Sequence, residues 1–223
     1  MASRDQDLFD LTGKVVLAAG GAGAIGAAMA RATAVYGAKV AIADRTVDAC
    51  EAVAATLSAS GCEAMGVGLN VLDPDSVAAA VTAVEAALGP VDVLINTVGT
   101  HIEQPAQDLT LDAWDTVLNV NLRGAFVLSQ AVARAMIASG RHGSHIHVTS
   151  VRSTLGIHRG YAAYVASKGG LGILIKQLAT EWAQYGIRVN GIAPTFTRTP
   201  LVDDYLNDPE FYGNLVKRIP LGR

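Results

Sequence analysis

The sequence predicts one α/β domain over residues 1–223, built on a doubly wound parallel sheet as a three-layer α/β/α sandwich. Apolar runs of strand length alternate with longer helix-like segments along the whole chain. These runs are continuously apolar, as is typical of strands that are covered on both faces. The chain has 223 residues, 51% of them hydrophobic, and no linker or repeat divides it, so it can bury one full core.

The strands and helices are expected in a regular order. Strand-like runs lie at 14–19, 39–44, 63–69, 91–96, 144–150 and 187–193. Helix-like segments lie at 24–37, 47–60, 74–89, 111–140 and 162–185. Because helices connect successive strands, the strands are expected to run parallel.

Composition and charge exclude several classes of protein. The chain has 17 basic and 20 acidic residues, a net charge of -3, and no dense basic block, so no nucleic-acid partner is expected. The longest uncharged run, 15–30, is rich in glycine and alanine, and the start has no apolar signal core, so no membrane association is expected. Cys50 and Cys62 are the only cysteines, which fits a reducing compartment. We expect a cytoplasmic protein that binds a small molecule.

A glycine-rich stretch follows the first predicted strand. Gly21, Gly23 and Gly26 satisfy the pattern G-x-G-x-x-G between a strand and a helix. Glycines let the backbone approach a pyrophosphate, and a helix amino terminus offers unpaired N–H groups. A chance match or a plain tight turn is the alternative in a chain so rich in glycine. The stretch indicates a Rossmann-type dinucleotide site.

Asp44 supports this interpretation because it ends the second predicted strand, eighteen residues after Gly26. A carboxylate there can accept hydrogen bonds from the ribose hydroxyls of the adenosine. It also repels a ribose phosphate, which favours NAD over NADP. The neighbouring Arg45 could reverse this preference by binding a phosphate, or it could be a solvated surface arginine.

Tyr164 and Lys168 lie four residues apart and therefore share one face of a predicted helix. Tyr161 is two turns from the lysine, about 10 Å along the axis, so Tyr164 is the candidate acid/base. A tyrosine pKa of about 10 must fall by roughly 2 to 3 units for work near neutrality. One ammonium about 4 Å away supplies an interaction on the order of 4 kcal/mol, which is sufficient. A helix surface pair is the alternative.

Ser150 ends the fifth predicted strand, fourteen residues before Tyr164. Ligands of doubly wound sheets bind at the carboxyl ends of the strands, so its hydroxyl can hold a substrate oxygen beside the tyrosine. Ser153 is a lesser alternative.

These motifs resemble those of the short-chain dehydrogenase/reductase family. The family's T-G-x-x-x-G-x-G maps onto Ala19, Gly20, Ala24 and Gly26, so alanine replaces the threonine and the middle glycine. A hydroxyl tie between strands is expected to be lost, and cofactor affinity to suffer. The family's N-N-A-G appears as "NTVG", which retains its first and last residues.

The resemblance implies the functional residues. The catalytic residues are Asn121, Ser150, Tyr164 and Lys168. The cofactor-binding residues are Gly20, Gly23, Ile25, Gly26, Asp44, Asn70, Val71, Asn96, Gly99, Tyr164, Lys168, Pro194 and Thr199. Asn121 matches the family's N-L-x-G motif, which its rival Asn119 does not, and is expected to hold a water of the proton relay.

Other parts of the resemblance concern the cofactor and the substrate. Asn70 stands where the family usually has an aspartate beside the adenine. "APTFTRT" resembles P-G-x-x-x-T, so Pro194 and Thr199 are expected near the nicotinamide carboxamide. The segment 200–213 is expected to form a substrate lid.

The implied activity is NAD(P)(H)-dependent interconversion of a secondary alcohol and a ketone. "SVRSTLG", "YVASKGG" and "ATEWAQYGI" are similar to the gluconate 5-dehydrogenase branch and other sugar or polyol dehydrogenases. The resemblance also implies a homo-oligomer, a dimer or tetramer joined through helices 111–138 and 162–185. The alternatives are a catalytically weak nucleotide-binding or interaction protein, a 3-oxoacyl carrier-protein reductase and a Rossmann-type methyltransferase.

The remaining expectations concern the histidines and the carboxyl end. His145 and His147 would share one face of a strand, but no Asp, Glu or Cys completes a metal-ligand set, so no metal is expected. His101 and His158 flank the presumed pocket. Members of the family usually continue through another helix and a last strand, which this chain is expected to lack because it ends at Arg223.

Overall fold

The computed structural model describes residues 8–199 and 202–222. The chain forms two compact units, one that extends to Ala193 and one that begins at Pro194, and each is described by itself. Three parts of the chain lie outside the described residues: residues 1–7, the first two residues of the expected lid (200 and 201), and residue 223.

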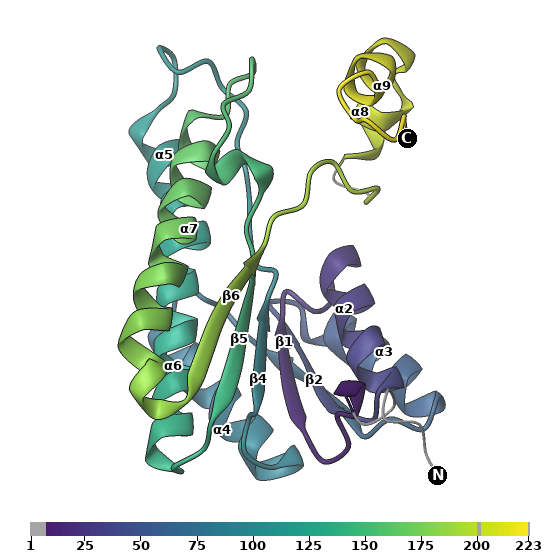
Figure 1. Cartoon of the computed structure of the whole chain (residues 1–223), viewed down its shortest axis with the longest axis vertical. Coiled ribbons are helices and arrows are strands. Elements are labelled where there is room, and N and C mark those ends of the chain that lie inside the picture. The colour runs from purple at the N-terminus through teal and green to yellow at the C-terminus, as the bar shows by residue number, and fades with distance from the viewer. Residues whose placement is uncertain (1–7, 200–201, 223) are drawn as a thin grey trace. The chain divides into compact units, whose positions relative to one another are not determined.

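The first unit contains a parallel sheet of six strands in the order β3-β2-β1-β4-β5-β6 (Figure 1). The strands are β1 (Val15–Ala19), β2 (Lys39–Asp44), β3 (Ala64–Gly68), β4 (Val93–Asn96), β5 (Gly143–Val148) and β6 (Ile187–Ile192). β1 pairs with both β2 and β4, so the strand order reverses between β1 and β4. The predicted doubly wound parallel sheet is confirmed, and the reversal point fixes where a ligand is expected.

Helices cover both faces of the sheet. The helices of this unit are α2 (Ala24–Val35), α3 (Val47–Ala59), α4 (Pro74–Leu88), α5 (Leu111–Leu118), α6 (Gly124–Ala138) and α7 (Ala162–Trp182), with short turns η2 (Val151–Ser153) and η3 (Ala183–Tyr185). Alternate residues of β1 face opposite layers: Leu17 packs with α4, α6 and α7, and Val16 packs with α2 and α3. Both are fully buried, so the sheet is the middle layer of three (Figure 1).

The predicted helix 111–140 is interrupted in the structure. A π-helical segment, η1 (Asn119–Arg123), separates α5 from α6. Its middle residue, Asn121, is fully buried and bonds outside its own helix, to Thr100 and Ser167. Short π-helical segments inside α-helices often mark functional sites. The predicted strand 144–150 also ends earlier, at Val148, so Ser150 lies beyond the strand.

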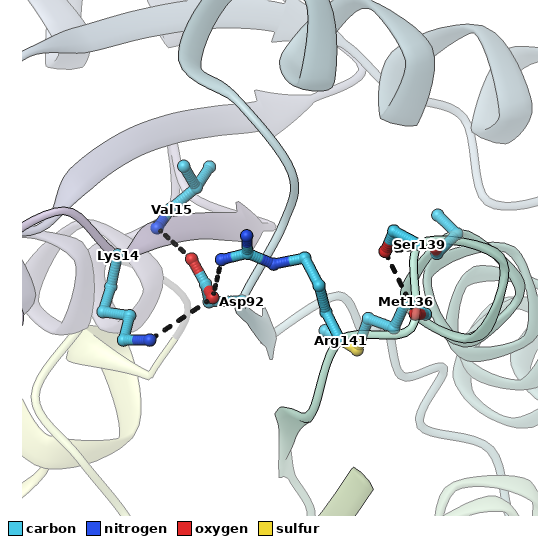
Figure 2. A network of polar contacts seen from close by, with 7 residues as sticks. Lys14, Val15, Asp92, Met136, Ser139 and Arg141 are labelled. Atoms are coloured by element: carbon cyan, nitrogen blue, oxygen red, sulfur yellow. Dashed lines mark hydrogen bonds and ion pairs between the residues drawn. The ribbon is translucent and has the colours of Figure 1, made fainter. Parts of the chain in front are cut away.

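The buried carboxylate of Asp92 lies at the amino-terminal edge of the sheet, opposite the carboxyl ends of the strands. Figure 2 shows Asp92 between Lys14 and Arg141, with Val15 beside it. Asp92 accepts hydrogen bonds from the Val15 amide at 3.0 Å and from Arg141 at 2.7 Å, and Lys14 Nζ lies 3.6 Å away. Burial acts to raise the pKa of Asp92, but Arg141, the Val15 amide and Lys14 together lower it below its usual value.

The second unit contains two short helices, α8 (Asp203–Asn207) and α9 (Pro209–Val216). Asp208 caps α9 by accepting hydrogen bonds from the amides of Glu210 at 2.9 Å and Phe211 at 3.3 Å. The Phe211 ring lies 5.2 Å from that of Phe196. The described part of the expected lid is therefore helical. Within residues 8–199 and 202–222, no helix is long and apolar enough to cross a membrane.

Candidate active site

Ser150 lies just beyond the carboxyl end of β5, at the edge of the sheet where ligands of such folds bind. Its side chain caps the turn η2 by accepting a hydrogen bond from the Arg152 amide at 3.1 Å. Only 7% of Ser150 is exposed. The cap fixes the hydroxyl in place, so a substrate meets a positioned donor.

Tyr164 and Lys168 both lie in the first two turns of α7, as the spacing predicted. Lys168 Nζ donates to the Val148 carbonyl at 2.9 Å and lies 5.9 Å from the centre of the Tyr164 ring. This places the ammonium between the end of β5 and the tyrosine. Burial lowers the pKa of Lys168 to about 8.

The expected depression of the Tyr164 pKa is not found. Burial raises the pKa of the phenol, and this effect exceeds the opposing effects of a hydrogen bond with the Ser150 side chain and of the Arg152 charge. Lys168 binds a backbone carbonyl, and its ammonium faces the ring of Tyr164. The hydroxyl of Ser150 is therefore the neighbour that most favours the phenolate.

Asn121 holds the chain segment that follows β4. Its Oδ1 accepts from the Thr100 amide at 2.7 Å, and its Nδ2 donates to the Thr100 carbonyl at 2.8 Å and to Ser167 Oγ at 3.0 Å. Ser167 precedes Lys168 on α7, so Asn121 links this loop to the helix that carries the tyrosine and lysine. Its rival Asn119 is exposed.

Gly99 lies where these groups converge. A Cβ atom at this position would lie 3.4 Å from Lys168 Nζ and 3.5 Å from Asn121 Oδ1. Through this point the structure brings Asn121 and Lys168 together. Tyr164 joins them because its ring centre lies 5.9 Å from Lys168 Nζ, and Ser150 joins them because its side chain acts on the Tyr164 phenol. The four residues form one cluster.

Three rings form one wall beside the cluster. The His101 ring lies 5.4 Å from that of Tyr161 and 6.2 Å from that of Tyr164, and the two tyrosine rings are 5.9 Å apart. Tyr161 is only 8% exposed and directly precedes α7. Tyr161 therefore packs against Tyr164 at the start of the helix.

The glycine loop between β1 and α2 fits the close backbone approach that a dinucleotide needs. Gly20 has φ +73°, a conformation that side chains rarely adopt, and a Cβ atom at Gly26 would collide with the Gly20 carbonyl. Gly23 is the N-cap of α2 and no side chain caps this helix, so its first N–H groups are available to an anion. Ile25 is half-buried in the first turn of α2.

Thr97 was missed as a functional residue, although it lies inside the quoted "NTVG". Its Oγ1 lies 3.0 Å from both the Ala19 and the Gly20 carbonyl oxygens. The expectation of a lost hydroxyl tie is therefore wrong, because a threonine on the partner strand supplies one. The available signal was a pair of differences from the family motifs. This chain has alanine in place of threonine at position 19, and threonine in place of asparagine at position 97.

The residues expected around the adenosine lie at the ends of β2 and β3. Asp44 Oδ1 accepts a hydrogen bond from the Arg45 amide at 2.7 Å. Asn70 Oδ1 accepts from the Leu72 amide at 3.1 Å, so its side chain shapes the turn before α4. Val71 is 5% exposed and belongs to the core, which leaves its backbone as the part that can face a ligand.

Asn96 is 3% exposed and links the turn after β4 to β5. Its Oδ1 accepts from the Val98 amide at 3.0 Å, so its Nδ2 is the donor in the 3.2 Å contact with His147 Nδ1. His147 Nε2 then carries the proton and donates to Ser129 Oγ at 3.2 Å. This order requires a neutral His147, and burial and Lys168 lower its pKa to about 4.

His145 differs from its neighbour. Both of its ring nitrogens are buried and have no hydrogen-bond partner among the residues that the structure describes. The His145 ring instead packs against an aromatic side chain, with its centre 5.4 Å from that of Trp182. Pro194 and Thr199 belong to the second unit, in which the Thr199 carbonyl accepts from the Val202 amide at 3.0 Å.

Known proteins share this arrangement. The family model for short chain dehydrogenase matches residues 14–210. Gluconate 5-dehydrogenase from Gluconobacter oxydans is 36% identical over 217 residues, 97% of this chain and 84% of that protein. D-threitol dehydrogenase from Mycolicibacterium smegmatis is 39% identical over 216 residues, 96% of this chain and 82% of that protein.

A solved structure agrees with these matches. The crystal structure of a gluconate 5-dehydrogenase from Burkholderia cenocepacia in complex with NADP and tartrate is 36% identical, with a TM-score of 0.93. The similarity covers 99% of this chain and 86% of that chain. The chain therefore belongs to the short-chain dehydrogenase family and is an NAD(P)-dependent oxidoreductase that acts on CH–OH groups.

Proposed function

We propose that this enzyme interconverts a secondary alcohol of a sugar or polyol and the corresponding ketone, with Tyr164 as the acid/base and NAD(H) as the preferred cofactor. The observation that carries the proposal is the convergence of three side chains: Ser150 acts to lower the pKa of the Tyr164 phenol, and the Lys168 ammonium lies 5.9 Å from the centre of the Tyr164 ring. The names of the relatives, gluconate and D-threitol dehydrogenases, support a hydroxylated substrate.

Each residue has a distinct role in this proposal. Ser150 donates a hydrogen bond to the substrate oxygen, and Tyr164 exchanges a proton with that oxygen. Lys168 would hold the ribose of the cofactor and adds a positive charge beside the Tyr164 ring, and Asn121 positions the loop next to the lysine. NAD(P), when bound, accepts or supplies the hydride.

The preference for NAD rests on Asp44. One of its carboxylate oxygens binds the Arg45 amide, and the group can still accept from two vicinal ribose hydroxyls. Gly20, Gly23, Ile25 and Gly26 would hold the pyrophosphate, and Asn70, Val71, Asn96 and Gly99 would line the adenosine and ribose side. Pro194 and Thr199 are proposed to bind the carboxamide of the cofactor.

The test is turnover of a panel of polyols, sugar acids and ketones, D-gluconate and D-threitol included, with NAD and NADP. Tyr164→Phe should lower kcat at least about a hundredfold on every substrate that the unmodified enzyme turns over. NADH binding, followed by fluorescence, should persist. Tyr161→Phe is the matched comparison and should lower kcat less than fivefold (about a 1 kcal/mol effect).

Two outcomes would contradict the proposal. Wild-type turnover by Tyr164→Phe would refute the acid/base assignment. NADH binding without turnover of any substrate would favour the alternative, a catalytically weak nucleotide-binding protein.

We further propose a homo-oligomer, a dimer or tetramer, joined through α5, α6 and α7. A groove of about 590 Å³ lies between these helices and is lined by apolar side chains that include Leu122, Phe126 and Ile173. Ile173 is 65% exposed. Contact with a second copy of the chain would remove this apolar surface from water. Ile173→Glu should lower the molar mass measured by light scattering, whereas Val35→Glu, a change at another exposed apolar residue, should not. An unchanged mass in both would contradict this interface.

A cytoplasmic location is proposed on chemical grounds. Cys50 and Cys62 are both free thiols, which suits a reducing compartment. Fractionation of the native host with an antibody to the protein tests the location.

A further inference from the structure

The turn that follows β4 is attached to the glycine loop through one side chain, that of Thr97. Its amide donates to the Ala19 carbonyl at 2.9 Å, continuing the pairing of β4 with β1. Its Oγ1 lies 3.0 Å from the carbonyl oxygens of Ala19 and Gly20. A hydroxyl has one proton, so a single donor is shared between these two acceptors. Thr97 thereby fixes both peptides at which the chain leaves β1.

The glycine loop is also shaped around this hydroxyl. A Cβ atom at Gly20 would collide with Thr97 Oγ1, and one at Gly26 would lie 2.8 Å from it. The two glycines at the ends of the loop therefore leave the space that the Thr97 hydroxyl occupies. The loop between them carries Gly23, the N-cap of α2, whose turn presents the free N–H groups.

The rest of the loop offers little that could replace this contact. Position 19 is an alanine, fully buried, with no group to hold the neighbouring strand. No side chain caps α2. The amides of Gly20 and Gly21 bond to the Ala43 carbonyl at 2.8 Å and 3.2 Å, which anchors the loop to β2 alone. On the β4 side, Thr97 makes the contact to the loop.

We propose that Thr97 is a positioning residue for the dinucleotide: its hydroxyl holds the glycine loop in the conformation that binds the pyrophosphate. The resemblance places a hydroxyl tie at position 19, which is an alanine here, and the Thr97 hydroxyl makes a tie at the same junction. Loss of the hydroxyl lets the loop populate conformations that do not bind. The apparent dissociation constant then rises in inverse proportion to the fraction of enzyme whose loop is competent to bind.

The turn that follows β4 also contacts the catalytic cluster, through residues other than Thr97. Thr100 is held by Asn121, and Gly99 faces Lys168. Because these contacts do not involve the Thr97 side chain, the catalytic cluster keeps its geometry in a Thr97 variant. Cofactor affinity should therefore change more than kcat.

The experiment compares Thr97→Val, which keeps the shape and removes the hydroxyl, with Thr97→Ser, which keeps the hydroxyl. NADH and NADPH binding is measured by fluorescence titration, so the result depends on neither substrate nor catalytic turnover. Thr97→Val should raise the dissociation constant of the better cofactor about tenfold, as expected when a buried acceptor loses its donor. Thr97→Ser should remain within about threefold of the unmodified enzyme. At saturating cofactor, kcat of Thr97→Val should stay within about threefold.

The matched control is Thr33→Val on α2. The Thr33 hydroxyl also donates to a backbone carbonyl, that of Ala30 at 2.8 Å, and is partly buried. Thr33→Val should lower the midpoint of thermal unfolding about as much as Thr97→Val does, while leaving cofactor affinity unchanged. Equal loss of affinity in Thr33→Val and Thr97→Val would assign the effect to general destabilisation and overturn the proposal.

A double variant tests whether a hydroxyl on β1 can replace that of Thr97. Ala19→Thr added to Thr97→Val places a hydroxyl on β1 and should recover at least part of the lost affinity if a tie at this junction is what matters. Unchanged affinity in Thr97→Val, or an equal loss in Thr97→Ser, would overturn the proposal. If Thr97→Val does not fold, Thr97→Ala, which also lacks the hydroxyl, is titrated against Thr97→Ser with the same expected ratio.

Discussion

Asn121 binds the Thr100 peptide on both sides, through hydrogen bonds of 2.7 Å to its amide and 2.8 Å to its carbonyl. A side-chain amide that mimics a backbone partner in this way holds the loop after β4 as rigidly as strand pairing would. It also explains the π-helical segment, because the wider turn at Asn119–Arg123 directs Asn121 inward, away from its own helix.

Asn121→Ala should therefore lower kcat at least about tenfold, because two buried backbone groups of Thr100 lose their partners and the loop in front of Lys168 is released. Steady-state kinetics at saturating cofactor measures this effect. Asn119→Ala is the matched control: the same substitution at an exposed residue of the same π-helical segment should change kcat less than twofold (well under 1 kcal/mol). Similar losses in both variants would contradict the assignment of Asn121.

Sequence patterns predicted the fold well because its strands are short and unbroken, and β1, β2, β4 and β5 are largely buried. The run 39–44 coincides with β2, Lys39–Asp44, and the helix at 74–89 ends within one residue of α4. The local sequence is enough to predict such segments, because apolar runs indicate the strands and capping residues such as Asp73, before Pro74, indicate where helices begin.

The contacts that were not predicted join residues far apart in the chain. Thr97 and Gly20 are 77 residues apart, and no local period records that their groups meet. Asn121 interrupts a helix whose apolar spacing continues through it, so periodicity alone indicated one unbroken helix. The spacing of Tyr164 and Lys168 concerns only one neighbour of the phenol, whereas its pKa depends on all of them: burial raises the pKa of Tyr164 and lowers that of Lys168, the directions that desolvation of both groups predicts.

Asp44→Ala should shift the cofactor preference toward NADP. The carboxylate can bind ribose hydroxyls and repels a ribose phosphate, so its removal weakens NAD binding and permits NADP. We expect the ratio of kcat/KM for NAD to that for NADP to fall at least about tenfold, which corresponds to 1.4 kcal/mol of discrimination. Asp48→Ala, in the exposed first turn of α3, is the control and should leave this ratio unchanged. A ratio unaffected by Asp44→Ala would show that Asp44 does not choose between the cofactors.

Asp92→Asn should destabilise the fold without affecting the cofactor or substrate. Asp92 joins β1 to Arg141 (Figure 2). This contact lies at the amino-terminal edge of the sheet, whereas Ser150 lies beyond the carboxyl end of β5. The loss of a buried carboxylate from its partners costs about 2 kcal/mol of unfolding free energy, allowing for the partial exposure of Arg141 and Lys14. Urea denaturation measures it, and KM values should stay within about twofold. A large change in KM with unchanged stability would be the contrary result.

His145 and His147 should make the enzyme sensitive to acid. Burial lowers the pKa of His145 to about 3 and that of His147 to about 4, and each histidine also lies near a further basic group, His147 and Lys168 respectively. Below about pH 6.5 the unfolded chain binds protons that the folded chain excludes, so stability falls as the pH falls. Each histidine contributes a slope that approaches about 1.4 kcal/mol per pH unit.

His145→Phe separates the two contributions. The phenyl ring keeps the edge-to-face contact with Trp182 and removes two buried nitrogens that have no hydrogen-bond partner in the described part of the chain. Between pH 6 and 4.5 the unfolding free energy of the variant should fall less steeply than that of the unmodified enzyme, by about 1.4 kcal/mol per pH unit. His142→Gln removes an exposed histidine that directly precedes β5 and is the control for the loss of a histidine as such. Identical slopes for His145→Phe and the unmodified enzyme would mean that the folded protein admits a proton at His145, and that the unpartnered ring nitrogens are reached by water.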